Sequence, residues 1–253
     1  MRQRLAALLI LALPFGIASA SAQIDVISRG PDNGTSTHVS GIDVLPLPGL
    51  PFTGTDTIIW TRPLADGSST VTYETAKVIR DGQGRLYRER HSFSPSADAN
   101  PEFTLRETLI EDPVAQTRIV CSTAVHACII TNYRAVMAPS LQPVGSFDHG
   151  KRYLNRDNLG SQIIDGLSVI GTLETTTIAP GTLGNSQPLK STREFWYSSD
   201  LETNITVLRK DPREGTQNIH LTVLSRSEPA PEVFAIPPGY NVRDLRQQGV
   251  AAK

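Results

Sequence analysis

The chain has 253 residues, of which 39% are apolar and 19% charged, so it can bury a sizeable core. Its 24 Lys and Arg residues nearly balance 25 Asp and Glu residues. This balance argues against a nucleic-acid partner, because non-specific binding depends on neutralising phosphates. With 19 Gly and 18 Pro, the chain also stays below the content typical of low-complexity disorder.

The first 22 residues have the pattern of an export signal. Arg2 and Arg4 precede an apolar stretch at 5–17, and the small residues of 20–22 suit a signal peptidase. That stretch contains Pro and Gly and is shorter than the roughly 20 residues of a spanning helix. We therefore expect 1–22 to be a signal peptide and the mature chain to be periplasmic or secreted, with no stable transmembrane segment.

The rest of the chain divides by composition. The Pro- and Gly-rich stretch 23–53 predicts an extended segment that crosses the surface of the domain or stays mobile. Over 54–240, polar and apolar residues alternate between turns rich in Asp, Gly and Pro, which predicts roughly ten strands in antiparallel hairpins. Residues 137–157 lose the alternation and predict a long loop with a short helix. Residues 241–253 predict a polar tail.

Two cysteines, Cys121 and Cys128, are the only ones in the chain. If 114–122 and 127–136 form a hairpin, the two cysteines lie opposite each other, at a Cα separation of about 4.5–5.5 Å that suits a disulfide. Export to an oxidising compartment favours the same bond. A metal site that includes His126 is the alternative, but three ligands leave a tetrahedral zinc site incomplete. We expect a disulfide and no metal.

Several segments resemble a family of uncharacterised secreted bacterial proteins. They are PFTG, LADGSST, RDGQGRLYRE, NLGSQIIDGLSVIGT, TTTIAPGTLGN, EFWYSSDL, DPREG and SEPAPEVFAIPPGY, which cover most of 51–240. The family usually has Ile-Pro-Ala-Gly where this chain has Ile-Ala-Pro-Gly at 178–181, a difference confined to one turn. This resemblance implies no known activity.

A looser resemblance concerns the fold. The order of the strands and the segment EFWYSSDLETNITVLRK resemble the half-barrel of periplasmic lipoprotein carriers and related sigma-factor regulators. The resemblance implies a mainly β fold, with a single antiparallel, strongly curved sheet and little helix. In that superfamily the curved sheet wraps an apolar concavity that takes acyl chains.

Catalytic motifs are missing from the sequence. It contains no G-x-S-x-G, no H-E-x-x-H, no P-loop and no G-x-G-x-x-G. We therefore predict no catalytic residue and no cofactor, and we do not expect an enzyme.

The strands carry large aromatic residues that are candidates for ligand contact. These are Trp60, Tyr73, Tyr87 and Phe103. Most large aromatics belong to a core, and one or two can line a concavity. In a half-barrel, we expect Tyr73 and Tyr87 on the inner face and Arg88 with Arg90 on the outer face.

A cluster of arginines on one hairpin is a candidate anion patch. Its members are Arg80, Arg85, Arg88 and Arg90. Glu74 and Glu89 lie on the same hairpin, so cross-strand ion pairing on a solvated face is the alternative.

These observations favour an exported, non-enzymatic binding module for a lipid or other apolar ligand in the cell envelope. The alternative is an envelope protein that binds another protein, or a structural scaffold without a small-molecule ligand. Neither the residues nor the resemblance decides between them.

Overall fold

The computed structural model describes residues 41–95, 103–135 and 141–246, so the expected signal peptide lies outside the described residues. Fourteen strands form one sheet, antiparallel except where β14 lies parallel to β7. The strands are β1 (Phe52–Pro63), β2 (Ser69–Arg80), β3 (Leu86–His91), β4 (Ser94–Pro95), β5 (Leu105–Asp112), β6 (Thr117–Ser122), β7 (Ala127–Asn132), β8 (Gly145–Phe147), β9 (Arg152–Ile164), β10 (Leu167–Ile178), β11 (Leu189–Ser198), β12 (Thr203–Asp211), β13 (Gly215–Ser225) and β14 (Asn241–Asp244).

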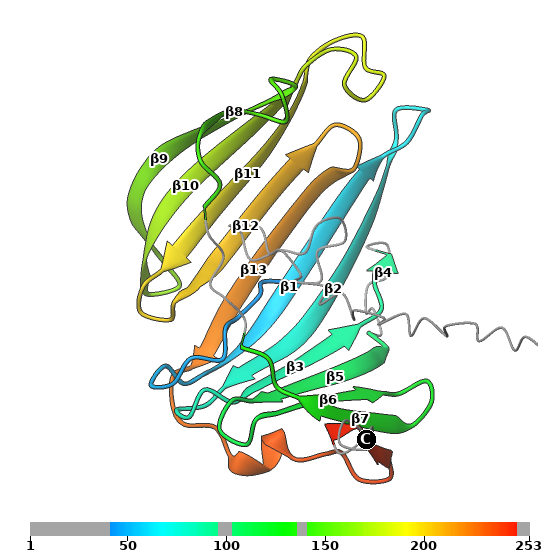
Figure 1. The fold of residues 1–253 in the computed structure, drawn as a ribbon, viewed down its shortest axis with the longest axis vertical. Coiled ribbons are helices and arrows are strands. Elements are labelled where there is room, and N and C mark those ends of the chain that lie inside the picture. The colour runs from blue at the N-terminus through cyan, green and yellow to red at the C-terminus, as the bar shows by residue number, and fades with distance from the viewer. Residues whose placement is uncertain (1–40, 96–102, 136–140, 247–253) are drawn as a thin grey trace, which may run out of the picture.

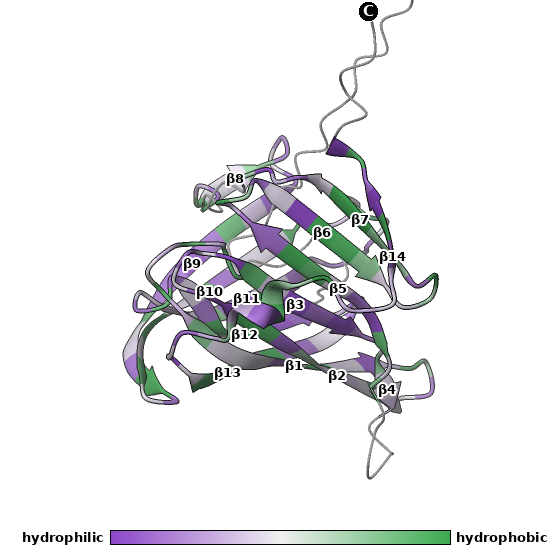
Figure 2. Cartoon of the chain, turned by 90° about the horizontal axis from the view of Figure 1, so that it is seen from below, coloured by the Kyte–Doolittle hydropathy of each residue, from purple (hydrophilic) through white to green (hydrophobic). Residues whose placement is uncertain are grey.

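The sheet is open and strongly curved. Its order is β14-β7-β6-β5-β3-β2-β1-β13-β12-β11-β10-β9-β8, with β4 paired to β2 outside this path. The outermost strands, β14 and β8, are therefore not paired with each other. Seen from below, both ends of this order bend to the same side of the central strands β13, β1 and β2 (Figure 2). The mainly β fold with a single half-barrel-like sheet is thus confirmed, and the sheet has one concave and one convex face.

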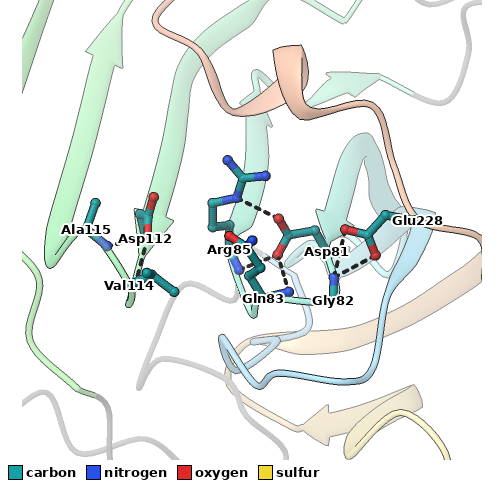
Figure 3. Close-up of polar contacts among 8 residues, drawn as sticks. All are labelled: Asp81, Gly82, Gln83, Arg85, Asp112, Val114, Ala115 and Glu228. Carbon is teal, nitrogen blue, oxygen red and sulfur yellow. Dashed lines mark hydrogen bonds and ion pairs between the residues drawn. The ribbon is translucent and has the colours of Figure 1, made fainter.

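Short polar turns connect the hairpins where the sequence places them. In the turn between β2 and β3, the Asp81 carboxylate accepts hydrogen bonds from the backbone N–H groups of Gln83 and Arg85 (Figure 3). Between β5 and β6, Asp112 accepts from the N–H groups of Val114 and Ala115 in the same way. Aspartate favours turns because its carboxylate can replace the backbone acceptors that a strand would supply.

The main apolar core lies on the concave face. Alternate residues of β1 from Phe52 onward are buried there together with their partners on β2 and β13. The strap, which we define as residues 41–51, crosses this face without forming a strand (Figure 1, blue). Its Ile42 and Val44 are each 1% exposed and belong to the core cluster. The strap, which is the described part of the segment 23–53 before β1, is thus buried in the core by its apolar residues.

A smaller core lies on the convex face. Ile79 of β2 and Ile110 of β5 pack there against Phe234. Phe234 ends a short 3-10 helix, η1 (Pro231–Phe234), which is the only helix in the described part of the chain. No helix among these residues is long and apolar enough to cross a membrane.

The long loop and short helix expected at 137–157 are wrong for the part that the structure describes. β8 lies within this stretch and β9 already begins at Arg152, with turns between them. Most side chains of β9 are exposed, because only the short β8 lies beyond it in the sheet. Both faces of such a strand tolerate polar residues. The alternation of polar and apolar residues that predicts a strand is therefore absent from this part of the sequence.

The expectation of a polar tail over 241–253 is wrong for the first residues of that stretch. Its first residues form β14, which pairs with β7 so that Val242 lies opposite Cys128. With four residues, this strand is too short to show a period, and 247–253 lie outside the described residues.

The hairpin of β6 and β7 has the expected register. Cys121 lies opposite Cys128, and their sulfur atoms form a disulfide. The predicted disulfide is confirmed.

Candidate functional site on the concave face

The alternation along β1, β2 and β3 decides which face each candidate aromatic reaches. Trp60 shares the concave face with Ile58 and Phe52, whereas Tyr73 lies opposite Ile59 on the convex face. Tyr87 lies opposite Ile79 and packs into the smaller core of the convex face. The expectation that both tyrosines lie on the inner face is therefore wrong.

Phe103 belongs with Tyr73, not with the concave face. The two rings meet edge to face, with 5.2 Å between their centres. Burial and a hydrogen bond to the Glu89 carboxylate raise the pKa of Tyr87 far above its ordinary value. Of the four aromatics that the sequence suggests, the structure brings Trp60 alone to the concave face.

Arg80 fastens the strap to the sheet. Its side chain is completely buried and donates hydrogen bonds to the carbonyl oxygens of Leu45, Leu50 and Leu201 at 2.6–3.0 Å. Its guanidinium also stacks over the ring of Phe52. Because burial disfavours a charged group, the pKa of Arg80 falls to about 10.

The other three arginines of the predicted patch are spread over different structures. Arg88 points to the concave face, where it donates to the carbonyl oxygen of Ile42 in the strap. Arg90 pairs with Glu107 on β5 at 3.4 Å. Arg85 pairs with Asp81 at 2.6 Å in the β2–β3 turn (Figure 3). The Arg85 guanidinium also stacks over the ring of Phe234. The expected outward direction of Arg88 is thus corrected, and these arginines hold elements together.

A buried carboxyl group lies directly under the strap. Asp56 of β1 accepts a hydrogen bond from the backbone N–H of Ile42 at 2.7 Å. Gly41 lies so close that a Cβ atom there would be 2.0 Å from the Asp56 Oδ2 atom. Burial raises the pKa of Asp56 to about 7, although Arg88 and the Ile42 N–H lower it. The sequence gives no sign of this contact, because it depends on where the strap crosses the sheet.

An apolar row crosses the centre of the concave face. We define the apolar row as Phe195, Val207, Ile219 and Ile58, which lie directly opposite one another on β11, β12, β13 and β1. All four are buried in the main core, in the cluster that also contains Ile42 and Val44 of the strap. The row thus gives the concave face an apolar centre that spans four strands.

A polar row runs beside the apolar row, two residues further along β1. We define the arginine row as Arg156, Glu174, Arg193, Arg209, Gln217 and Trp60, which lie opposite one another from β9 to β1. Glu174 is 1% exposed. Its Oε1 atom accepts from Arg156 and its Oε2 atom from Arg193, each at 2.9 Å. The sequence does not predict this row, because its members are separated by up to 157 positions (217 minus 60).

Comparisons with known proteins give structural likeness only. No family model and no curated protein match the sequence. A LolA superfamily protein from Nitrosomonas europaea is similar, with a TM-score of 0.30 and 10% identity over 75% of this chain and 92% of that one. An uncharacterised conserved protein from Thermus thermophilus has a TM-score of 0.39 and 7% identity over 76% and 90% of the two chains.

MucB from Pseudomonas aeruginosa, solved in complex with MucA, is also similar, with a TM-score of 0.34 and 11% identity. The likeness covers 76% of this chain and 58% of the MucB structure. Similar structures thus include a LolA superfamily protein, as the looser resemblance implies, while the sequence-level family stays a prediction. At these TM-scores, function has to be inferred from the residues of the sheet itself.

Proposed function

We propose that this chain is a non-enzymatic binding module of the bacterial cell envelope, which holds an apolar ligand on the concave face of its sheet. The observation that carries the proposal is the apolar row at the centre of an open, curved sheet. A sheet normally covers its apolar face with a second sheet or with helices. In the described residues, η1 packs on the convex face instead, and the strap crosses the concave one.

The strap is an unusual cover for a core because polar contacts fasten much of it. Asp56 binds the N–H of Ile42, Arg88 binds the carbonyl oxygen of the same residue, and Arg80 binds two further carbonyl groups. Only Ile42 and Val44 of the strap belong to the apolar cluster. A ligand that fills their place covers the same apolar surface, and concave, mainly apolar surfaces are where proteins bind small apolar molecules.

The proposal is tested on the chain exported with its own leader and purified without detergent. We expect organic extraction and mass spectrometry to recover a lipid, and a fluorescent fatty acid to bind the delipidated protein with one-to-one saturation. If neither lipid nor probe binds, the concave face is a closed core. In that case the alternative function, contact with another envelope protein or a scaffold role, takes the place of this one.

A matched pair of strap variants connects this binding to the concave face. Gly41→Ala places a methyl group against Asp56 and loosens the strap, whereas Gly49→Ala meets no atom within 4 Å. We expect Gly41→Ala to bind the probe several-fold more tightly than Gly49→Ala, because less of the strap competes with the probe. Equal affinities would place the probe elsewhere.

A further inference from the structure

We propose that residues 41–44 of the strap, which we call the gate, cover the apolar row while Asp56 carries a proton and uncover it when Asp56 is ionised. This inference rests on the proposed function and adds its regulation. The gate contains Ile42 and Val44, the strap residues that belong to the apolar cluster. Its position therefore decides whether a ligand can reach the apolar row.

The Asp56 carboxyl group lies where an ionised carboxylate is poorly stabilised. Asp56 is 2% exposed, and its Oδ2 atom accepts one hydrogen bond, from the N–H of Ile42. Its Oδ1 atom is buried and has no hydrogen-bond partner among the described residues. A buried carboxylate requires several donors to offset its lost hydration, and a proton on the group removes the charge. The closed gate therefore favours the protonated form.

The charged groups around Asp56 leave this preference in place. Arg88 on β3 lowers the pKa of Asp56, whereas Glu74 on β2 raises it. Arg88 is shared with the gate, because it also donates to the gate backbone and its Nη1 atom lies 3.9 Å from the Asp43 Oδ1 atom. On β13 the residue opposite Asp56 is the uncharged Leu221. Burial outweighs the attraction of Arg88 and raises the pKa of Asp56 to about 7.

The second anchor of the strap does not titrate in the same range. Arg80 holds the later part of the strap through the carbonyl oxygens of Leu45 and Leu50. Burial lowers the pKa of Arg80 to about 10, so this side chain stays charged between pH 5 and pH 8. The gate can therefore leave the sheet while the rest of the strap stays fastened, and Asp56 controls only the part that covers the apolar row.

Opening of the gate is coupled to the proton because Asp56 has two environments. With the gate closed its pKa is about 7, and with the gate open water reaches the carboxyl group, which then ionises near its ordinary pKa of 3.8. The closed state thus binds the proton more tightly. The ratio of open to closed gate rises by up to about tenfold per pH unit between these two values and levels off above them. A ligand that needs the open gate therefore binds more tightly at pH 8 than at pH 5.

The experiment uses a neutral fluorescent probe, N-phenyl-1-naphthylamine, so that the probe itself does not titrate. Its affinity for the delipidated wild-type chain is measured at pH 5, 6, 7 and 8, and we expect binding about tenfold tighter, or more, at pH 8 than at pH 5. Hydrogen exchange of the strap is followed in the probe-free protein and corrected for the intrinsic effect of pH. We expect the gate to be protected at pH 5 and to lose protection by pH 8.

Two buried carboxyl groups on the concave face give a matched pair of variants. Asp56→Asn still accepts from the Ile42 N–H and cannot ionise. We expect this variant to bind the probe at every pH as weakly as the wild type does at pH 5, and to keep the gate protected. Glu74→Gln removes the other carboxyl group, whose pKa burial also raises, and is expected to retain the pH dependence. Urea unfolding confirms that both variants are folded at each pH.

The outcomes separate the gate from the proposed function. Equal probe affinity at pH 5 and pH 8 in the wild type would overturn the gate and leave apolar binding in place. A pH dependence that persists in Asp56→Asn, or that disappears in Glu74→Gln, would assign the effect to another group and overturn the gate as well. If the probe binds at no pH, the proposed function itself fails.

Discussion

Asp56 is an acidic side chain held where water cannot reach it. Burial raises its pKa from 3.8 to about 7, and burial also raises the pKa of Glu74 on the neighbouring strand. In the unfolded chain the Asp56 carboxyl ionises near its ordinary pKa, so between about pH 4 and pH 7 the folded state binds more protons than the unfolded one. The free energy of unfolding contributed by this group therefore falls as the pH rises through that window.

Replacing this carboxyl tests the sign of the effect. Asp56→Asn keeps an oxygen for the Ile42 N–H and removes the charge. We expect the variant to be more stable than the wild type at pH 8 and to lose less stability between pH 5 and pH 8, as measured by urea unfolding. Asp66→Asn serves as the control, because Asp66 is exposed and hydrogen bonds to Ser68 lower its pKa. A wild-type pH profile retained in Asp56→Asn would contradict the assignment.

Single residues also explain why the arginines of the β2–β3 hairpin could not be interpreted from sequence. Arg80 and Arg88 look like members of a solvated patch because they stand among other charged residues. In the structure they donate to backbone carbonyl groups of the strap. Such acceptors belong to a segment without a periodic pattern, so no property of the hairpin itself indicates them.

Tyr87 lies on the convex face, so its substitution is expected to affect stability and not ligand binding. Its ring belongs to the convex cluster with Ile79 and Phe234. Tyr87→Asp is therefore expected to lower stability by about 3 kcal/mol or more, the cost of removing a buried aromatic, without a specific loss of probe binding. Urea unfolding and probe titration measure the two effects separately. Loss of binding in a fully stable variant would contradict this placement.

At the scale of single elements, the strap depends on one glycine. The backbone φ angle is +117° at Gly41 and +80° at Gly49. Alanine therefore strains the backbone at both positions. Only at Gly41 does the new Cβ also overlap the Asp56 carboxylate. We expect Gly49→Ala to cost about 1 kcal/mol and Gly41→Ala about 3 kcal/mol in urea unfolding. Equal costs would mean that the strap is not held against β1.

The β6–β7 hairpin is closed by its disulfide. Cys121 and Cys128 are both buried, and seven positions separate them in sequence. Because the closed loop is short, the bond is expected to add about 2 kcal/mol of stability. Urea unfolding of the protein with both cysteines replaced by alanine measures this loss. Thiol labelling of the unreduced wild-type chain is expected to give no signal, and labelling of both cysteines would disprove the bond in the native protein.

Comparison of elements shows how far sequence patterns reach. The β6–β7 hairpin could be predicted to the residue, because a short connection between two alternating strands fixes their register. The bounds of β9 could not be predicted in this way, because most of its side chains are exposed and polar and apolar residues do not alternate along it. The arginine row requires the pairing of β1 with β13, which joins the first long strand to the last one. Hairpin rules describe neighbours in sequence and do not predict such a contact.

At the scale of the whole molecule, the sheet has two free ends. At one end lies the short strand β8, which is next to the polar strand β9 in the sheet. At the other end, β14 covers β7, whose residues include Cys128, Ile129 and Ile130. The backbone N–H of Leu245 donates to the carbonyl oxygen of Ile130 in β7, and that of Asn241 donates to the carbonyl oxygen of His126, just before β7, each at 2.9 Å. Edge strands with apolar residues pair readily with other chains, and a covering strand prevents this.

Truncation tests the role of this covering strand. Removing 241–253 is expected to expose the β7 edge and to produce dimers or larger species in size-exclusion chromatography. Removing 247–253 keeps β14 and serves as the control, which is expected to elute like the full chain. A monomeric protein after the longer truncation would show that the β7 edge needs no cover.

The parallel pairing of β14 with β7 also has a consequence for the order of events in the cell. Because a chain is synthesised from its N-terminus, β7 appears well before β14, and seven other elements of the described chain appear between them. For that interval the apolar edge stays open, and the half-barrel must either remain unfolded or be shielded by another protein. The time at which β14 is synthesised therefore determines when the β7 edge is protected from pairing with other chains.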